Sequence, residues 1–336
     1  MKEGITIAGT IAVDEIKEIE KYPNQSELTT IKSVTRSIGG AVSNCAVSLA
    51  KIDGELPINT VAMIGEDERG DYLKERLSHY KNIDSSQVKV FGDTPFTDVY
   101  QDATSRTFFT YKGNALYFDE SKIDYQQLHT KIFHLAYILL LDGLDNEDKE
   151  YGTKTAKVLR NVQKLGIRTS IDIVSENSDR YQKLVPPCLK FTNYCIINEL
   201  EAGNSVGIAL RNEDGKLIEH NIRKVLYRLK ELGVKDWAVI HTPEGSFGID
   251  GKEIHSIPSL LIDNSSIKGT VGAGDAYVSG VLYGALKEFS LVEAMQLGTA
   301  AAASSLFEAD GTSGVKAFDE LVKMYQEYPK RNRVEI

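Results

Sequence analysis

Short runs of β-branched and apolar residues alternate with longer amphipathic stretches along most of the chain, and this alternation limits the possible folds most strongly. It is typical of strand–helix–strand units, in which parallel strands form a sheet that helices cover on both faces. Ligands of such sheets bind beyond the carboxyl ends of the strands. Strands are expected at Ile5–Gly9, Ile58–Ile64, Ile132–Leu141, Arg168–Asp172, Tyr194–Asn198 and Trp237–His241.

Three segments interrupt the alternation. Residues 28–37 and 96–111 alternate polar and apolar side chains without an intervening helix, as antiparallel strands exposed on one face do. Ser246–Ser256 carries Asp250 and Gly251 between two strand-like runs and predicts a hairpin.

The chain has no internal repeat and no long linker, so we expect one α/β domain over residues 1–336. Its centre should be a mainly parallel sheet flanked by helices. The irregular segments predict a small β-sheet lid, formed by about residues 10–37 and 95–113.

Composition excludes several classes of protein. The formal net charge is −9, and no arginine-rich run offsets it, so nucleic acid is not an expected partner. Cys45, Cys188 and Cys195 lack metal-site or disulfide spacing and are expected to be reduced. The longest apolar run, Leu135–Leu141, is too short to span a membrane. The apolar stretch near the start has acidic flanks, unlike a signal peptide, so we expect a cytoplasmic protein.

The strongest local signal is a glycine-rich turn at residues 269–276, G-T-V-G-A-G-D-A, followed by an apolar helical run. Backbone N–H groups of a glycine-rich turn can approach an anion closely at a helix start, where the helix dipole favours negative charge. Asp275 beside such a site can accept a proton from an attacking hydroxyl. The alternative is that the glycines allow tight helix packing and Asp275 only caps the helix.

A second glycine turn, Gly39-Gly40, opens a helix in which Asn44 lies one turn inside. An asparagine can donate and accept hydrogen bonds, which suits vicinal hydroxyl groups, although an exposed residue at a helix start is equally compatible. Asp14 follows the first strand and could accept from substrate hydroxyls or cap a turn.

Two further strand ends carry polar residues. Asn198 ends a strand, and Glu201 in the following helical turn could hold the water shell of Mg²⁺ or simply complement the helix dipole. Thr242, Gly245 and Gly248 follow another strand, and this turn could admit a nucleotide. The histidines show no metal-ligand spacing, and neither a Walker-type phosphate loop nor a nucleophile elbow is present.

In this order, the segments resemble the PfkB (ribokinase-like) family of carbohydrate kinases from about residue 5 to about residue 328. The resemblance implies a Rossmann-like core of the ribokinase type with a small β-sheet lid. It implies sugar binding by Asp14, Gly39, Gly40 and Asn44, with Arg106 as a lid contact to the substrate. It also implies an anion hole at Gly272, Ala273 and Gly274, with Asp275 as the catalytic base.

The resemblance further implies ATP and Mg²⁺ as cofactors. Asn198, Thr242, Gly245 and Gly248 then belong to the nucleotide and phosphate site, and Glu201 holds Mg²⁺ indirectly through water. The expected reaction is in-line transfer of the γ-phosphate to a substrate hydroxyl, with lid closure excluding water. Family members often dimerise through their lids, so we expect a homodimer and a small-molecule sugar as partners.

Two departures from the family pattern refine this expectation. Many members carry Asp-Thr where this chain has Gly269-Thr270, and their K⁺ activation depends on that carboxylate. We therefore expect weak or absent K⁺ activation, with Lys268 as a possible tethered positive charge near the anion hole. Ala41 stands where ribokinases tend to carry lysine, which favours a fructokinase-like or ketodeoxygluconokinase-like activity over ribose phosphorylation.

Two alternatives remain open. The acceptor could be a nucleoside, with Phe96, Phe108 or Tyr111 stacking on its base, although these aromatic residues could equally form the core of the lid. The chain could also be a non-catalytic sugar-binding protein, since fold does not dictate function. The presence of Asp275 argues against that second alternative.

Overall fold

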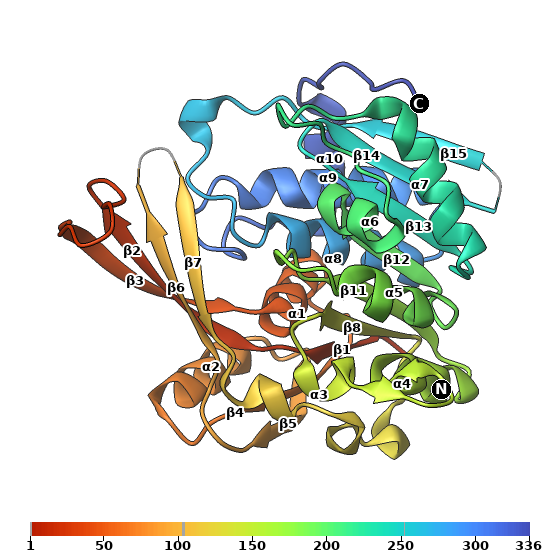
Figure 1. Ribbon diagram of the computed structural model, residues 1–336, viewed down its shortest axis with the longest axis horizontal. Coiled ribbons are helices and arrows are strands. Elements are labelled where there is room, and N and C mark those ends of the chain that lie inside the picture. Colours follow the sequence, from red (N-terminus) through yellow and green to blue (C-terminus); the bar gives the residue numbers. More distant parts are fainter. Residues whose placement is uncertain (1, 103–104, 252) are drawn as a thin grey trace.

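The computed structural model describes residues 2–102, 105–251 and 253–336. Within these residues a nine-stranded sheet forms the centre, in the order β15-β14-β13-β12-β11-β8-β1-β4-β5 (Figure 1). Strands β5 to β13 of this order pair in parallel, and β13, β14 and β15 pair antiparallel. The strands are β1 (Ile5–Gly9), β4 (Ile58–Ile64), β5 (Ile83–Val90), β8 (Ile132–Ile138), β11 (Arg168–Ile173), β12 (Tyr194–Asn198), β13 (Trp237–His241), β14 (Gly245–Asp250) and β15 (Glu253–Pro258).

The predicted central strands and the hairpin at 246–256 are confirmed, with two differences. Strand β8 ends at Ile138, three residues before the expected end, because Leu139 adopts a left-handed φ of 78° and turns the chain. Strand β5 was not predicted. It lies at the edge of the sheet, and its side chains do not alternate cleanly between buried and exposed.

Helices cover both faces of the sheet and divide the core into two layers. On one face, α1, α2, α8, α9 and α10 pack over alternate strand residues such as Ile5 and Ile196. The opposite face carries α4 to α7, packed over neighbours such as Cys195 and Ile197. The helices are α1 (Ala41–Ile52), α2 (Glu68–Ser78), α3 (Asp142–Asp145), α4 (Lys154–Lys164), α5 (Tyr181–Leu189), α6 (Glu199–Val206), α7 (Glu219–Glu231), α8 (Ala273–Leu286), α9 (Leu291–Ser305) and α10 (Phe318–Glu327).

A second sheet of four strands, which we call the lid sheet, projects from the body in the order β3-β2-β6-β7 (Figure 1). Its strands are β2 (Ala12–Ile19), β3 (Ile31–Gly39), β6 (Phe96–Gln101) and β7 (Arg106–Tyr111). The pairs β2–β3 and β6–β7 are antiparallel, as expected. Strands β2 and β6 pair in parallel, which was not expected. Residues 103–104 of the expected lid lie outside the described part.

The two sheets are directly connected, because β2 follows the carboxyl end of β1 after two residues. The lid sheet therefore starts at the edge of the central sheet where ligands are expected. A minor two-stranded ribbon, β9 (Glu147–Asp148) with β10 (Gly152–Thr153), lies elsewhere. Among the described residues, the three cysteines are free and buried, as expected, and no helix is long and apolar enough to cross a membrane.

Candidate active site

Two cavities meet at the start of helix α8. The carboxylate cavity has a volume of about 400 Å³ and is lined by Asp14, Asp172, Glu201 and Asp275, among others. The apolar cavity has a volume of about 460 Å³. Its wall includes Leu260, Ile262, Ile267, Ala303 and Leu306. Both cavities are lined by Asn198, His241 and Gly274, so a ligand in one can reach a ligand in the other.

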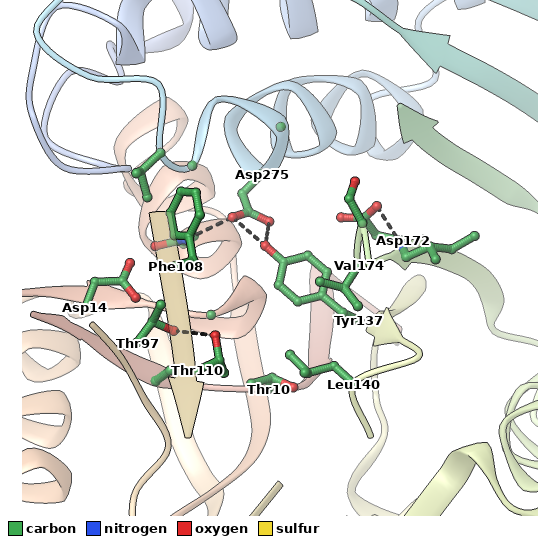
Figure 2. A pocket seen from close by; sticks show the side chains of 18 of the residues that line it. Thr10, Asp14, Thr97, Phe108, Thr110, Tyr137, Leu140, Asp172, Val174 and Asp275 are labelled. Atoms are coloured by element: carbon green, nitrogen blue, oxygen red, sulfur yellow. Dashed lines mark hydrogen bonds between the residues drawn. The ribbon is translucent and has the colours of Figure 1, made fainter. Parts of the chain in front are cut away.

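Asp275 lies in the first turn of α8 and faces the carboxylate cavity (Figure 2). Its side chain is 4% exposed and accepts hydrogen bonds from two different elements. Asn44 Nδ2 in α1 donates to Oδ2 at 2.8 Å, and the Tyr137 hydroxyl in β8 contacts Oδ1 at 2.8 Å and Oδ2 at 2.9 Å. Burial raises the pKa of Asp275, while these hydrogen bonds, with a weaker one from Cys45, oppose that rise.

The start of α8 has the features of an anion site. Gly272 precedes the helix with a left-handed φ of 73°, and no side chain caps the first turn. A side chain at Gly272 would overlap the backbone of Gly311, so the position requires glycine. The backbone N–H groups of this turn, at Ala273 and Gly274, therefore have no side-chain competitor for a negatively charged ligand.

The turn at Gly39-Gly40 positions Asp14. A Cβ atom at Gly39 would overlap the Asp14 carboxylate, and one at Gly40 would lie 2.8 Å from the Thr10 carbonyl oxygen, where φ is already 76°. Burial, and secondarily the charge of Asp275, raises the pKa of Asp14 to about 7. Within the described residues, the buried Oδ1 of Asn44 and Oγ1 of Thr10 have no hydrogen-bond partner, which suits a ligand rich in hydroxyl groups.

Asn198 and Glu201 form a capping box at the start of α6. Glu201 accepts from the Asn198 backbone at 3.0 Å and from the Ser175 hydroxyl at 2.7 Å, so it has the structural role expected of an acidic first helical turn. Its carboxylate also lines the carboxylate cavity, and burial raises its pKa to about 7. Burial, and secondarily the nearby charge of Glu201, raises the pKa of Asp172 well above its usual range. These paired acidic groups fit a hydrated Mg²⁺, which uses few direct protein ligands.

The turn after β13 is built by Thr242. Its hydroxyl accepts from the backbone N–H groups of Glu244 and Gly245, both at 3.1 Å. Thr242 and Gly245 line the apolar cavity. Gly248 does not: a Cβ atom there would lie 2.7 Å from the Met295 sulfur, so this glycine allows β14 to pack against α9.

Arg106 and Lys268 lie differently from the expectation. Arg106 lines neither cavity, and its Nη2 donates to the Lys268 carbonyl at 3.4 Å, linking the lid sheet to the loop before α8. The Lys268 ammonium group pairs with Glu308 at 3.3 Å and is largely exposed. At Gly269 a Cβ atom would lie 2.6 Å from the Ala309 carbonyl oxygen, so the backbone passes close to the 308–309 loop.

Several residues of the site were not predicted. Tyr137, Asp172 and His241 each lie at or next to the carboxyl end of a parallel strand, which was the signal available in the sequence. Arg211 had no such signal. Its guanidinium group donates to Glu199 and Glu244, each at 2.6 Å, and so ties the start of α6 to the Thr242 turn.

The carboxylate cavity is electrostatically acidic. Of the described residues that line it, Lys112 is the one cation, and its ammonium group is paired with Asp142 at 2.6 Å. Burial lowers the pKa of His241 to about 4, so the imidazole is neutral at physiological pH. An anionic ligand would therefore meet little attraction in this cavity away from the start of α8.

Comparison with known proteins identifies the family of the chain. Residues 4–317 match the model of the pfkB family carbohydrate kinases. A nucleoside kinase of Methanocaldococcus jannaschii is 26% identical over 340 residues, covering 97% of this chain and 98% of the relative. A 5-dehydro-2-deoxygluconokinase of Clostridium beijerinckii is 25% identical, covering 90% and 86%.

The fold is similar to that of solved structures as well. The structure of Arabidopsis thaliana ribokinase complexed with ribose and ATP has a TM-score of 0.76 at 18% identity, covering 97% of this chain and 99% of that one. The chain therefore belongs to the pfkB family of carbohydrate kinases, enzymes that transfer phosphate to an alcohol group.

Proposed function

We propose that this protein uses ATP to phosphorylate a hydroxyl group of a small sugar or sugar acid, with Asp275 as the catalytic base. One observation carries the proposal. Asp275 lies on the wall of a hydrophilic cavity at the point where an apolar cavity meets it, next to an uncapped helix start. An acceptor in the first cavity and a nucleotide in the second would bring their reacting groups together there.

The apolar cavity suits the nucleotide. Its aliphatic wall can enclose an adenine ring, and Thr242 and Gly245 also line it. Gly274 lines the same cavity, so the phosphates could meet the backbone N–H groups at the start of α8. Asn198 and Glu201 would hold a hydrated Mg²⁺, which when bound neutralises charge on the phosphates.

The chemistry assigned to the chain's own residues is proton transfer and charge stabilisation. The oxygen of the acceptor hydroxyl attacks the γ-phosphorus while Asp275 takes the hydroxyl proton. The bond between the γ-phosphorus and the bridging β-phosphate oxygen breaks, which releases ADP. The N–H groups at Gly272, Ala273 and Gly274 face the charge that develops on the transferred group. Closure of the lid sheet over the acceptor would exclude water and limit ATP hydrolysis.

The charge of the carboxylate cavity favours an uncharged acceptor. Asp14, Asp172, Glu201 and Asp275 line it, while its lysine is already paired with Asp142. A carboxylate or phosphate on the acceptor would be desolvated beside these acids without a free cation. Of the two activities suggested by the sequence, this favours a fructokinase-like over a ketodeoxygluconokinase-like one.

A nucleoside is the second candidate, and Phe108 is the observation that favours it. Phe108 lines the carboxylate cavity together with Asp14 and Asn44, so a base could stack on its ring while its ribose meets those two residues. The other two aromatic residues considered from the sequence, Phe96 and Tyr111, instead pack on each other with ring centroids 5.3 Å apart. The nucleoside kinase from M. jannaschii adds support.

We also propose that two copies associate through the lid sheet. Strand β3 is an edge strand, and Ile31 and Val34 on it are 44% and 59% exposed. Exposed apolar side chains on an unpaired edge are characteristic of surfaces that meet a partner. Sedimentation of the full chain, compared with a Val34→Glu variant, tests this: a dimer that the variant converts to monomer supports it, and a monomeric wild type contradicts it.

The acceptor is identified by measuring ADP release with Mg-ATP across free sugars, sugar acids, phosphorylated sugars and nucleosides. Stimulation by free sugars supports the proposal, and stimulation confined to nucleosides supports the second candidate. A Phe108→Ala variant separates them further, because loss of base stacking should raise the nucleoside KM about tenfold or more. Phe109→Ala is the matched control, since that ring packs edge-on against Tyr100 with centroids 5.8 Å apart.

A further inference from the structure

Tyr137 makes the closest contact to Asp275 from the central sheet. It comes from β8, next to the carboxyl end of that strand, and its ring lines the carboxylate cavity with the hydroxyl pointing toward the carboxylate (Figure 2). The phenol oxygen lies 2.8 Å and 2.9 Å from the two carboxylate oxygens, almost equally from both. A hydroxyl in this position fixes the rotation of the carboxylate as well as its location.

Hydrogen-bond donors rather than charges hold Asp275. The groups that face it from the surrounding elements are acidic or neutral: Asp14 in β2, Cys45 in α1 and Asp172 in β11. Glu201 and the neutral His241 line the same cavity, and the Lys112 ammonium group forms a salt bridge with Asp142. In such surroundings a buried carboxylate binds a proton readily and then cannot act as a base.

Tyr137 is a donor that does not itself ionise under ordinary conditions. Burial, followed by the charges of Asp275 and Asp172, raises the pKa of its phenol well above the usual value. Its proton therefore stays on the phenol oxygen and is directed at Asp275. A hydrogen bond to the charged form of a carboxylate stabilises that form.

The carboxylate retains room for a substrate. Two ionised carboxylate oxygens offer about four acceptor sites. Tyr137 and Asn44 supply two donors to them, and the cysteine contact from Cys45 is weak, at 3.9 Å. An acceptor hydroxyl entering the cavity can therefore donate to Asp275 without displacing Tyr137.

We propose that Tyr137 is a positioning residue for the base: its hydroxyl orients the Asp275 carboxylate and keeps it ionised until an acceptor hydroxyl donates its proton. The inference rests on the proposed role of Asp275 as the base. It assigns to the central sheet, through β8, an indirect part in activating the acceptor, exerted through Asp275.

The test compares Tyr137→Phe with wild type in the dependence of kcat/KM for the acceptor on pH, at fixed Mg-ATP. Loss of the donor should move the acidic limb of the profile upward by about one pH unit, so activity falls about tenfold at low pH and recovers at high pH. Titration of ATP itself is the same for both proteins and cancels. Tyr194→Phe is the matched control, because this strand tyrosine bonds Arg168 at the opposite, amino-terminal end of β12.

Three results for Tyr137→Phe would overturn the inference. An equal loss of kcat/KM at every pH would indicate packing alone, and an increase in kcat/KM would indicate that Tyr137 blocks the acceptor. A pH profile like that of the Tyr194→Phe control would show that the hydroxyl has no effect on the base. A second measurement needs neither activity nor a change at Tyr137. In full-length protein with ¹³Cζ-labelled tyrosine, one resonance should shift as Asp275 titrates and lose that shift in Asp275→Asn. Absence of such a resonance contradicts the inference, whereas absence of any acceptor phosphorylation by wild type contradicts only the proposed function.

Discussion

The side-chain amide of Asn44 donates a hydrogen bond to Oδ2 of Asp275 at 2.8 Å, joining α1 to α8 across 231 positions of sequence. Within the described residues its Oδ1 is buried without a partner. The same side chain can thus stabilise the base with its amino group and accept from a substrate hydroxyl with its oxygen.

Replacement of Asn44 by alanine should remove both interactions. Since a hydrogen bond to a charged group contributes about 1.5–3 kcal/mol, kcat/KM for the acceptor should fall about 10- to 100-fold. Ser48→Ala is the matched control, one turn further along α1, where the hydroxyl is buried without a partner and does not line the cavity. Steady-state kinetics that are the same for both variants would show that Asn44 serves packing only.

Asp14 should make the folded protein less stable as pH rises. Its folded pKa is about 7, above the ordinary value of 3.8, so the folded state binds its proton more tightly than the unfolded chain does. The stabilising effect of that proton is full below about pH 4 and is lost as pH rises through about 7. The advantage of Asp14→Asn over wild type in free energy of unfolding should therefore grow across this window, to about 2–4 kcal/mol.

Urea unfolding from pH 4 to pH 8 measures this difference. Asp71→Asn, which changes a largely exposed carboxylate, is the control and should track wild type at every pH. A difference between Asp14→Asn and wild type that does not vary with pH would show that Asp14 is ionised throughout.

Monovalent cations should have little effect on the reaction. Residue 269 supplies no carboxylate, and its backbone lies against the carbonyl groups of Glu308 and Ala309. The tethered cation considered from the sequence, Lys268, pairs with Glu308. Initial rates in potassium, sodium and choline chloride at equal ionic strength should therefore agree. A many-fold increase specific to K⁺ would contradict this expectation.

Most of the fold could be predicted because buried parallel strands are short, continuous apolar runs, as in Ile5–Gly9 and Trp237–His241. The edge strand Ile83–Val90 could not, since exposure on its outer side removes that pattern. The glycine turns could be predicted because the local backbone conformation requires glycine there, as the φ of 73° at Gly272 shows.

The site could be predicted only in part from the sequence, because some of its contacts join residues that are far apart along the chain. Asp14, Asn44 and Asp275 are tied to local turns, whereas the contact of Tyr137 with Asp275 joins residues 138 positions apart. The place of Tyr137 close to a strand end was the one signal in the sequence, and the expected end at Leu141 put it inside the strand, where it resembled a core residue. Gly248 was expected in the nucleotide turn and Arg106 as a lid contact to the substrate, yet Gly248 packs against α9 and Arg106 donates to the Lys268 carbonyl.

The central claim is that Asp275 is the base of an acceptor-dependent kinase, and the most direct measurement is ADP release by wild type and Asp275→Asn with Mg-ATP and the best acceptor. Asp145→Asn, a buried carboxylate outside both cavities, is the control. The account predicts a loss of about 10²- to 10⁴-fold in Asp275→Asn alone, with Mg-ATP still raising the Tm of that variant. Acceptor-dependent ADP release at an undiminished rate in Asp275→Asn would contradict it.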